Sequence, residues 1–370
     1  MSTSKEITKD DVARLLGEPS PDIRAATAEK VGSYFAAEEL GETERELAED
    51  IFRVMVKDAE VRVRRALAET LKASPGLPAD VARALAADVH AVALPVIEFS
   101  DVLSDSDLIE IIRSKDVARQ LAVARRQRIS QDVSDALVET DNEEVVSTLV
   151  DNEGAEIREA TYGRLLDRFG DKTRITDAIA GRPGLPITVA ERLVAMVSDS
   201  LRERLTAQHD LSADLLGDLL IESRERATVG LLSRNIRKPD LAELIEQMHK
   251  AGRLTPTLII RALCMGDLTF FETALAKRAK IPAVNAHQLV HHSDSKALER
   301  LFARAEMPES LLDLARIGID IARESGATGG DDREQFRKIV IERVITSAED
   351  GDVDNDDLDY LIGKLGKKAA

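Results

Sequence analysis

The chain has 370 residues, of which 44% are hydrophobic, 32% charged and only 3% aromatic, and its formal net charge is −17. This share of apolar residues is enough for extensive cores and excludes wholesale disorder. The acidic balance repels phosphate backbones, which counts against broad binding to nucleic acid or to anionic membranes.

Localisation and redox state follow from simple features. The first residues have no signal-peptide hydrophobic core, and the longest apolar run, at about residues 91–97, is far shorter than a membrane span. We therefore expect a cytoplasmic protein without a membrane span. The single cysteine, Cys264, allows no disulfide within the chain, and its apolar helical setting is more typical of a small core residue than of a nucleophile.

Helical signals begin near the N-terminus. Residues 8–11 give a helix start, residues 19–22 interrupt the pattern, and residues 23–31 predict a second helix. A longer helix is expected at about residues 43–57, because Thr43 and Glu46 have the spacing of a capping box.

A recurring motif organises residues 74–137. Leu77-Pro78, Leu103-Ser104 and Ile129-Ser130 lie 26 residues apart, and each precedes a short pattern of apolar residues at helical spacing. Such a helix has one narrow apolar stripe, which it can bury only against neighbours. A unit of this length holds two helices of about ten residues and two turns. The sequence therefore predicts stacked helical hairpins with a period of about 26 residues.

The motif returns further along the chain. Serine or threonine at its second position is a good N-cap, and proline is tolerated at the start of a helix. The later occurrences are Leu185-Pro186, Leu211-Ser212, Leu254-Thr255, Ile281-Pro282 and Met307-Pro308.

Two kinds of repeat are suggested by these residues. The turns before Val61-Arg62 and Ile157-Arg158 resemble HEAT-type repeats, and the Leu-Pro/Ser-x-Asp-Val units resemble the leucine-rich-repeat-variant type. Across roughly residues 10–320, and particularly residues 252–271, the chain resembles a bacterial family described only as a domain of unknown function with HEAT-like repeats. The resemblance implies an α-solenoid and brings no catalytic residues with it.

The expected fold is all-α, an α-solenoid of stacked helical hairpins with a short C-terminal helical cap. Capping is favoured over a detachable docking element because a stack of repeats needs a polar terminal cover. The expected segments are N-terminal helical repeats (1–57), HEAT-like repeats (58–235), C-terminal helical repeats (236–324), a Gly-rich linker (325–332) and a helical cap or tail (333–370).

Two patterns invite a metal interpretation. His287 and His291 are four residues apart, with His292 beside them, and this spacing suits two metal ligands on one helix face. No motif supplies a third ligand, so we interpret the group as a solvated helix face and expect no metal and no cofactor. The aspartates of residues 350–359 lack the glycine and glutamate of a calcium loop and indicate an acidic helix start.

Clustered arginines are the remaining candidates for a site. If equivalent helices share one face, a ladder for a phosphorylated or acidic ligand is possible. The favoured alternative is that these arginines pair with the abundant acidic residues of neighbouring repeats. The candidate ligand-groove arginines are Arg62, Arg65, Arg119, Arg125, Arg126 and Arg128.

No sequence motif identifies an enzyme. The chain has no P-loop, no dinucleotide-binding glycine pattern after a strand and no nucleophile elbow. The favoured hypothesis is a non-enzymatic scaffold or regulatory adaptor whose concave groove holds a segment of a partner protein. The alternative is a solenoid that binds a nucleotide or nucleic acid through its arginines.

Overall fold

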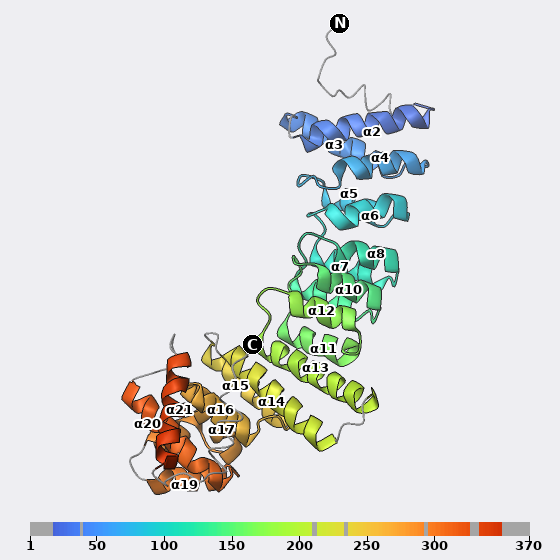
Figure 1. Cartoon of the computed structure of the whole chain (residues 1–370). Coiled ribbons are helices and arrows are strands. Elements are labelled where there is room, and N and C mark those ends of the chain that lie inside the picture. Colours follow the sequence, from blue (N-terminus) through green and yellow to red (C-terminus); the bar gives the residue numbers. More distant parts are fainter. Residues whose placement is uncertain are drawn as a thin grey trace. The chain divides into compact units, whose positions relative to one another are not determined.

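The computed structural model describes residues 18–37, 40–208, 213–232, 236–291, 295–325 and 333–349 (Figure 1). Every regular element in these ranges is a helix, so the predicted all-α class is confirmed. The predicted helix start at residues 8–11, most of the Gly-rich linker and the aspartate-rich tract after residue 349 lie outside the described residues.

The chain forms two compact units, residues 1–184 and residues 185–370. Their boundary falls inside the segment 58–235 that was expected to hold the HEAT-like repeats. The first unit contains α2 (Pro21–Ala36), α3 (Glu42–Met55), α4 (Val61–Leu71), α5 (Ala79–Ala86), α6 (His90–Phe99), α7 (Asp105–Arg113), α8 (Val117–Ala124), α9 (Gln131–Val138), α10 (Glu143–Asp151), α11 (Glu159–Phe169) and α12 (Thr173–Gly181).

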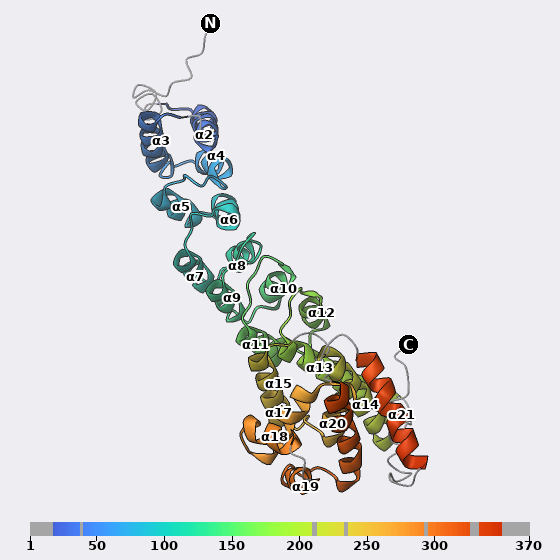
Figure 2. The same ribbon diagram turned by 90° about the vertical axis from the view of Figure 1, so that its left-hand side faces the viewer.

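Helices of the first unit pack in two rows. The even-numbered helices contact one another in succession from α2 to α12, and α7, α9 and α11 do the same in the odd-numbered row. The two rows are visible side by side in Figure 2. Each odd-numbered helix also packs against an even-numbered neighbour along the chain, so the rows share a core.

Helices α5, α7 and α9 begin where the sequence motif places them, directly after Pro78, Ser104 and Ser130. Both serines accept a hydrogen bond from a first-turn backbone N–H, which satisfies an otherwise unpaired donor. The apolar residue before each start is buried, and these residues are Leu77, Leu103 and Ile129. Burial of the preceding apolar residue therefore marks all three starts, and a serine cap marks those of α7 and α9.

Polar side chains join successive even-numbered helices. Arg126, after α8, donates to Ile97 O (2.5 Å) and Ser100 O (2.8 Å) at the end of α6. Asn152 donates to carbonyls at the end of α8, and Arg182 to carbonyls at and just beyond the end of α10. The last carbonyls of a helix have no partner within it, so each of these side chains completes the helix before its own.

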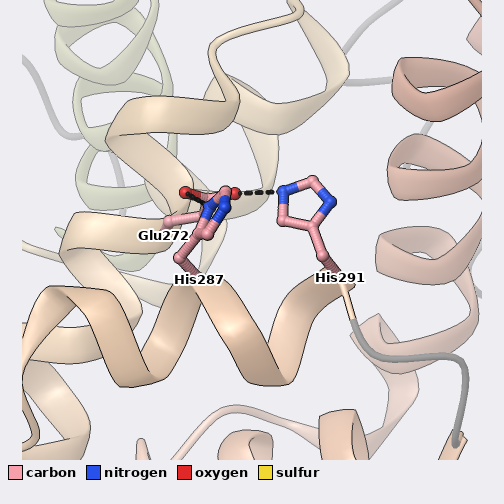
Figure 3. A group of neighbouring side chains, drawn as sticks. All are labelled: Glu272, His287 and His291. Carbon is pink, nitrogen blue, oxygen red and sulfur yellow. Dashed lines mark hydrogen bonds and ion pairs between the residues drawn. The ribbon is translucent and has the colours of Figure 1, made fainter.

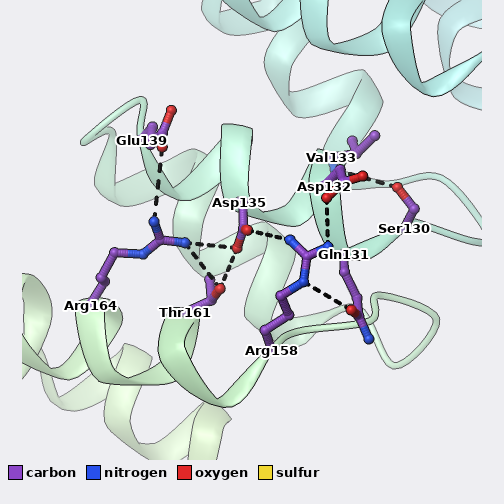
Figure 4. A network of polar contacts seen from close by, with 9 residues as sticks. All are labelled: Ser130, Gln131, Asp132, Val133, Asp135, Glu139, Arg158, Thr161 and Arg164. Atoms are coloured by element: carbon purple, nitrogen blue, oxygen red, sulfur yellow. Dashed lines mark hydrogen bonds and ion pairs between the residues drawn. The ribbon is translucent and has the colours of Figure 1, made fainter.

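Ion pairs join the odd-numbered helices α9 and α11 (Figure 4). Arg158 Nη1 lies 2.6 Å from Asp135 Oδ2, Arg164 Nη2 lies 2.8 Å from Asp135 Oδ1, and Thr161 donates to the same carboxylate. Burial alone would raise the pKa of Asp135, but the hydrogen bonds from Thr161 and Arg158 hold it below its usual value. Asp135 is therefore an anionic junction between two helices.

The second unit is built around one hydrophobic core in which Phe270 and Phe271 are fully buried. Helices α20 and α21 both pack against α16, and α21 buries Phe336 and Val340 in this core. The helices are α13 (Ile187–Gln208), α14 (Ala213–Leu232), α15 (Lys238–Lys250), α16 (Pro256–Cys264), α17 (Leu268–Ala279), α18 (Ala283–His291), α19 (Ser295–Arg304), η1 (Glu309–Leu311), α20 (Leu312–Ser325) and α21 (Arg333–Glu349).

Among the described helices, none is both long enough and apolar enough to cross a membrane.

Candidate functional site

A groove of about 320 Å³ lies beside α5 and α7 in the first unit. Ala86 and Leu103 give it an apolar lining that belongs to the core, and Ile111 adds a half-buried side chain. Charges of both signs surround this lining, from Arg83, Asp107, Glu110 and Arg119. An apolar floor with polar groups around it is typical of a site that binds a side chain of another molecule.

The N-terminus of α7 holds one of these charges in place. Asp107 Oδ2 accepts from the backbone N–H of Ser104 (3.0 Å), and the hydroxyl of Ser104 accepts from the N–H of Asp107 (3.3 Å). The hydrogen bond from the Ser104 side chain is the main cause that lowers the pKa of Asp107. Asp107 therefore presents a negative charge to the groove at neutral pH, and Arg83 Nη1 lies 3.8 Å from its Oδ1.

Of the six predicted ligand-groove arginines, Arg119 reaches this groove. Its Nη2 donates to the carbonyl of Asp88 (2.7 Å), just after α5, and its Nε lies 3.6 Å from Asp116. Only 19% of the side chain is exposed. Arg119 thus links α8 to the end of α5 and shapes one wall of the groove.

Arg126 cannot reach a ligand. The residue is 6% exposed, and its guanidinium donates to the two carbonyls at the end of α6. Burial lowers its pKa, with opposing contributions from Asp101 and Asp105. A buried guanidinium that is hydrogen-bonded to the backbone has a structural role. Arg126 is therefore not a candidate for binding a ligand.

The other four arginines lie on the surface and differ in their partners. Arg62 Nη1 lies 2.5 Å from Asp22 Oδ1. This ion pair agrees with the prediction that the arginines pair with acidic residues nearby. Arg65, Arg125 and Arg128 are exposed and form no ion pair with any residue that the structure describes. These three remain the candidates for an anionic ligand.

A second cluster lies in the second unit, where α17 and α18 form a hairpin (Figure 3). His287 Nδ1 lies 2.8 Å from Glu272 Oε2, and His291 Nε2 lies 2.7 Å from Glu272 Oε1. The two imidazole rings are 4.4 Å apart between centroids. One donor atom from each of the three residues lies within 4.8 Å of the other two, a separation compatible with a shared metal ion.

The turn between the helices creates this cluster. Lys280 ends α17 in the left-handed conformation (φ 53°), and Ile281 N–H donates back to Ala276 O (3.0 Å). This is the hydrogen bond of a Schellman-type helix end, and it reverses the chain within a few residues. Glu272 lies eight residues before Lys280 and His287 seven after it, so the antiparallel helices bring them level.

Glu272 is the residue that sequence reasoning missed. The histidine spacing was recognised, but no motif pointed to a third ligand. The available signal was the predicted helix start at Ile281-Pro282, because folding the chain there places residues equally far from the turn side by side. His292 lies outside the described residues.

The second unit also contains a buried group of charges. Glu225 is 4% exposed and accepts hydrogen bonds from Thr255 and Thr257, both 2.5 Å. Glu191 is 1% exposed, with Arg253 Nη1 3.2 Å away, and burial raises its pKa against the influence of that arginine. Glu225 Oε2 also lies 3.6 Å from Arg261 Nε, so a buried charge pair joins α14 to α16, and the Glu191–Arg253 pair joins α13 to the turn before α16. Both pairs hold helices of the second unit together.

The fold and these sites define an all-α protein whose candidate sites lie between neighbouring helices. The model of the family DUF2336, described as an uncharacterised protein conserved in bacteria, matches residues 92–354. The chain belongs to this family. The expectation of an uncharacterised bacterial family is thereby confirmed. Comparisons with curated proteins and with solved structures give no match.

Proposed function

We propose that the first unit is an α-solenoid of HEAT-like or leucine-rich-repeat-variant-like hairpins with a period of about 26 residues. Three successive odd-numbered helices start at Ala79, Asp105 and Gln131, which supports this period. The carbonyl-capping side chains support it as well, because each reaches residues 26 to 32 positions earlier in the chain. A repeated layer with a repeated link to the preceding layer is the physical basis of a solenoid.

The proposed function is non-enzymatic protein–protein interaction, as a cytoplasmic scaffold or regulatory adaptor. The observation that carries it is the groove beside α5 and α7, which combines an apolar lining with charges of both signs. Such a groove suits an extended segment that inserts one apolar side chain and places polar groups against Arg83, Asp107, Glu110 and Arg119.

Photo-crosslinking in cells tests this proposal. A photoreactive amino acid replaces Ile111, which lines the groove, and in a control strain it replaces Ala91, an exposed residue of α6 outside the groove lining. The expected result is one recurrent crosslinked protein at position 111 that is missing at position 91. Ile111→Glu should then reduce recovery of that protein with the full chain. No crosslink at position 111, or the same products at both positions, contradicts the proposal.

A second candidate function, binding of a phosphate-bearing ligand, is favoured by Arg65, Arg125 and Arg128, which are exposed and have no ion pair within the described part of the chain. Arg125→Glu combined with Arg128→Glu is the informative variant, since a charge reversal at the buried Arg126 would damage the fold. The wild-type protein should bind a nucleotide or oligonucleotide with an affinity that falls steeply as salt is raised, and the variant should lose it. Unchanged anion affinity in the double variant contradicts this candidate.

A further inference from the structure

We propose that Glu272, His287 and His291 form a binding site for a divalent transition-metal ion, with Zn²⁺ as the reference ion. This site belongs to the second unit, and the inference is independent of the protein-interaction function proposed for the first unit. Two imidazoles and one carboxylate provide the donor set.

The donor atoms are close to the arrangement that a metal requires. In a tetrahedral site with bonds of 2.0–2.1 Å, neighbouring donor atoms are about 3.4 Å apart. The Glu272 oxygens lie 2.8 Å from His287 Nδ1 and 2.7 Å from His291 Nε2. Each of these two contacts has to lengthen by about 0.6–0.7 Å for an ion to replace the hydrogen-bonding proton. All the donor atoms already lie within 4.8 Å of one another.

Both helices fix their donors through the core. On α17, Glu272 follows the fully buried Phe270 and Phe271, and its own side chain is 13% exposed. On α18, Ala286 and Val290 are buried, and each directly precedes one of the two histidines. The histidines therefore share the face of α18 that borders α17, so the three donors are positioned before an ion arrives.

The same geometry leaves room for further ligands. His287 is 58% exposed and His291 is 32% exposed, so solvent reaches the cluster on the histidine side. Three protein ligands and an accessible position are the arrangement of catalytic zinc sites, in which water completes the coordination. Imidazole nitrogen favours Zn²⁺, Co²⁺, Ni²⁺ or Cu²⁺ over Mg²⁺ and Ca²⁺, which prefer sites made entirely of oxygen ligands.

A hydrogen-bonded cluster without a metal is the competing explanation, and the chain contains a matched comparison. His90 Nε2 lies 2.6 Å from Asp116 Oδ2 on an exposed surface, so it forms the same kind of histidine–carboxylate contact without a second histidine. If an ordinary pair of this kind bound zinc, His90 would contribute as much as His287 or His291. The proposal predicts that it contributes nothing.

Calorimetric titration of the tag-free full chain with Zn²⁺ tests the site. The wild-type protein should bind one equivalent saturably, and His287→Ala, His291→Ala and Glu272→Gln should each weaken the affinity at least tenfold. His90→Ala should leave the affinity unchanged, and Mg²⁺ should not compete. Circular dichroism of every variant verifies the fold. If Glu272→Gln does not fold, His287→Ala decides the question, because its half-exposed side chain can be removed without opening the core.

A spectroscopic readout complements the titration. Co²⁺ in a tetrahedral site absorbs visible light far more strongly than hydrated octahedral Co²⁺, and this absorption should appear with the wild-type chain and disappear with His291→Ala. Absence of saturable Zn²⁺ binding overturns the proposal. Equal loss of binding in His90→Ala and His287→Ala overturns it as well, since the ion would then not discriminate the cluster from a simple pair.

Discussion

Replacing Arg126 by methionine tests whether a side chain that follows α8 completes the end of α6. Methionine keeps a long unbranched side chain at this buried position, so the change removes mainly the guanidinium. Two hydrogen bonds from a charged donor, to Ile97 O and Ser100 O, are lost with it. A hydrogen bond to a charged group contributes about 1.5–3 kcal/mol, and a buried carbonyl left without a partner costs about 1–3 kcal/mol.

Part of this loss is offset because the variant no longer buries a charge. The opposing influence of burial is evident in the lowered pKa of Arg126. We expect a net destabilisation of about 2–4 kcal/mol. A difference of 1.4 kcal/mol corresponds to a factor of ten in an equilibrium constant. Amides of α6 that exchange when this helix opens locally should therefore exchange about 30 to 700 times faster in the variant.

Peptide-resolved hydrogen exchange of the full chain is the assay. It reports each helix separately, which matters because a chain with two compact units need not unfold in one step. Arg125→Met is the matched control, since its side chain is exposed and a surface change is expected within about 0.5 kcal/mol of wild type. Exchange in α6 that is equally fast in both variants refutes the role assigned to Arg126.

Three further predictions concern other contacts. Asp135→Asn should cost about 1–2 kcal/mol at neutral pH. Because the folded-state pKa of Asp135 is lowered, its contribution should be complete above about pH 4 and vanish as pH falls through that lowered pKa, so urea unfolding of variant and wild type should converge in acid. Gly154→Ala places a Cβ 2.0 Å from the backbone oxygen of Gln127 and should lower Tm. Gly163→Ala should leave Tm unchanged or raise it, because its Cβ would meet no atom within 4 Å beyond the backbone of its own helix. Cys264 is fully buried and burial raises its pKa to about 12, so a thiol reagent should label it only after denaturation; labelling of the native chain at the rate of the unfolded chain would contradict this.

The sequence predicted the starts of α7 and α9 because capping is local, but the expected capping box of Thr43 and Glu46 is wrong: α3 begins after Gly41, whose N–H donates to Glu44. Ser104 and Ser130 accept hydrogen bonds from amides of the turn that follows. The apolar residue before each serine is buried in the core. The helical spacing of apolar residues in the recurring motif likewise predicted the all-α class. These features depend on residues only a few positions apart, so the sequence itself contains the information needed to predict them.

The contact of Arg126 with the end of α6 and the cluster of Glu272, His287 and His291 could not be predicted in the same way. Arg126 is among the candidate ligand-groove arginines of the sequence because charge and spacing do not reveal which carbonyls a guanidinium contacts. Glu272 joins two histidines only after the chain reverses at Lys280, a non-glycine residue in the left-handed region. Both depend on where distant segments meet, and that information enters through tertiary structure.

The carbonyl-capping side chains of the first unit have a consequence for how its length can change. Each even-numbered helix from α6 to α10 is finished by a residue supplied later in the chain, from Arg126, Asn152 or Arg182. Cutting the chain between such a helix and its finishing residue leaves exposed ends that the remaining part cannot repair. A deletion or insertion that removes or adds a helix together with its finishing residue keeps every donor paired with an acceptor, so such changes in length should be tolerated best.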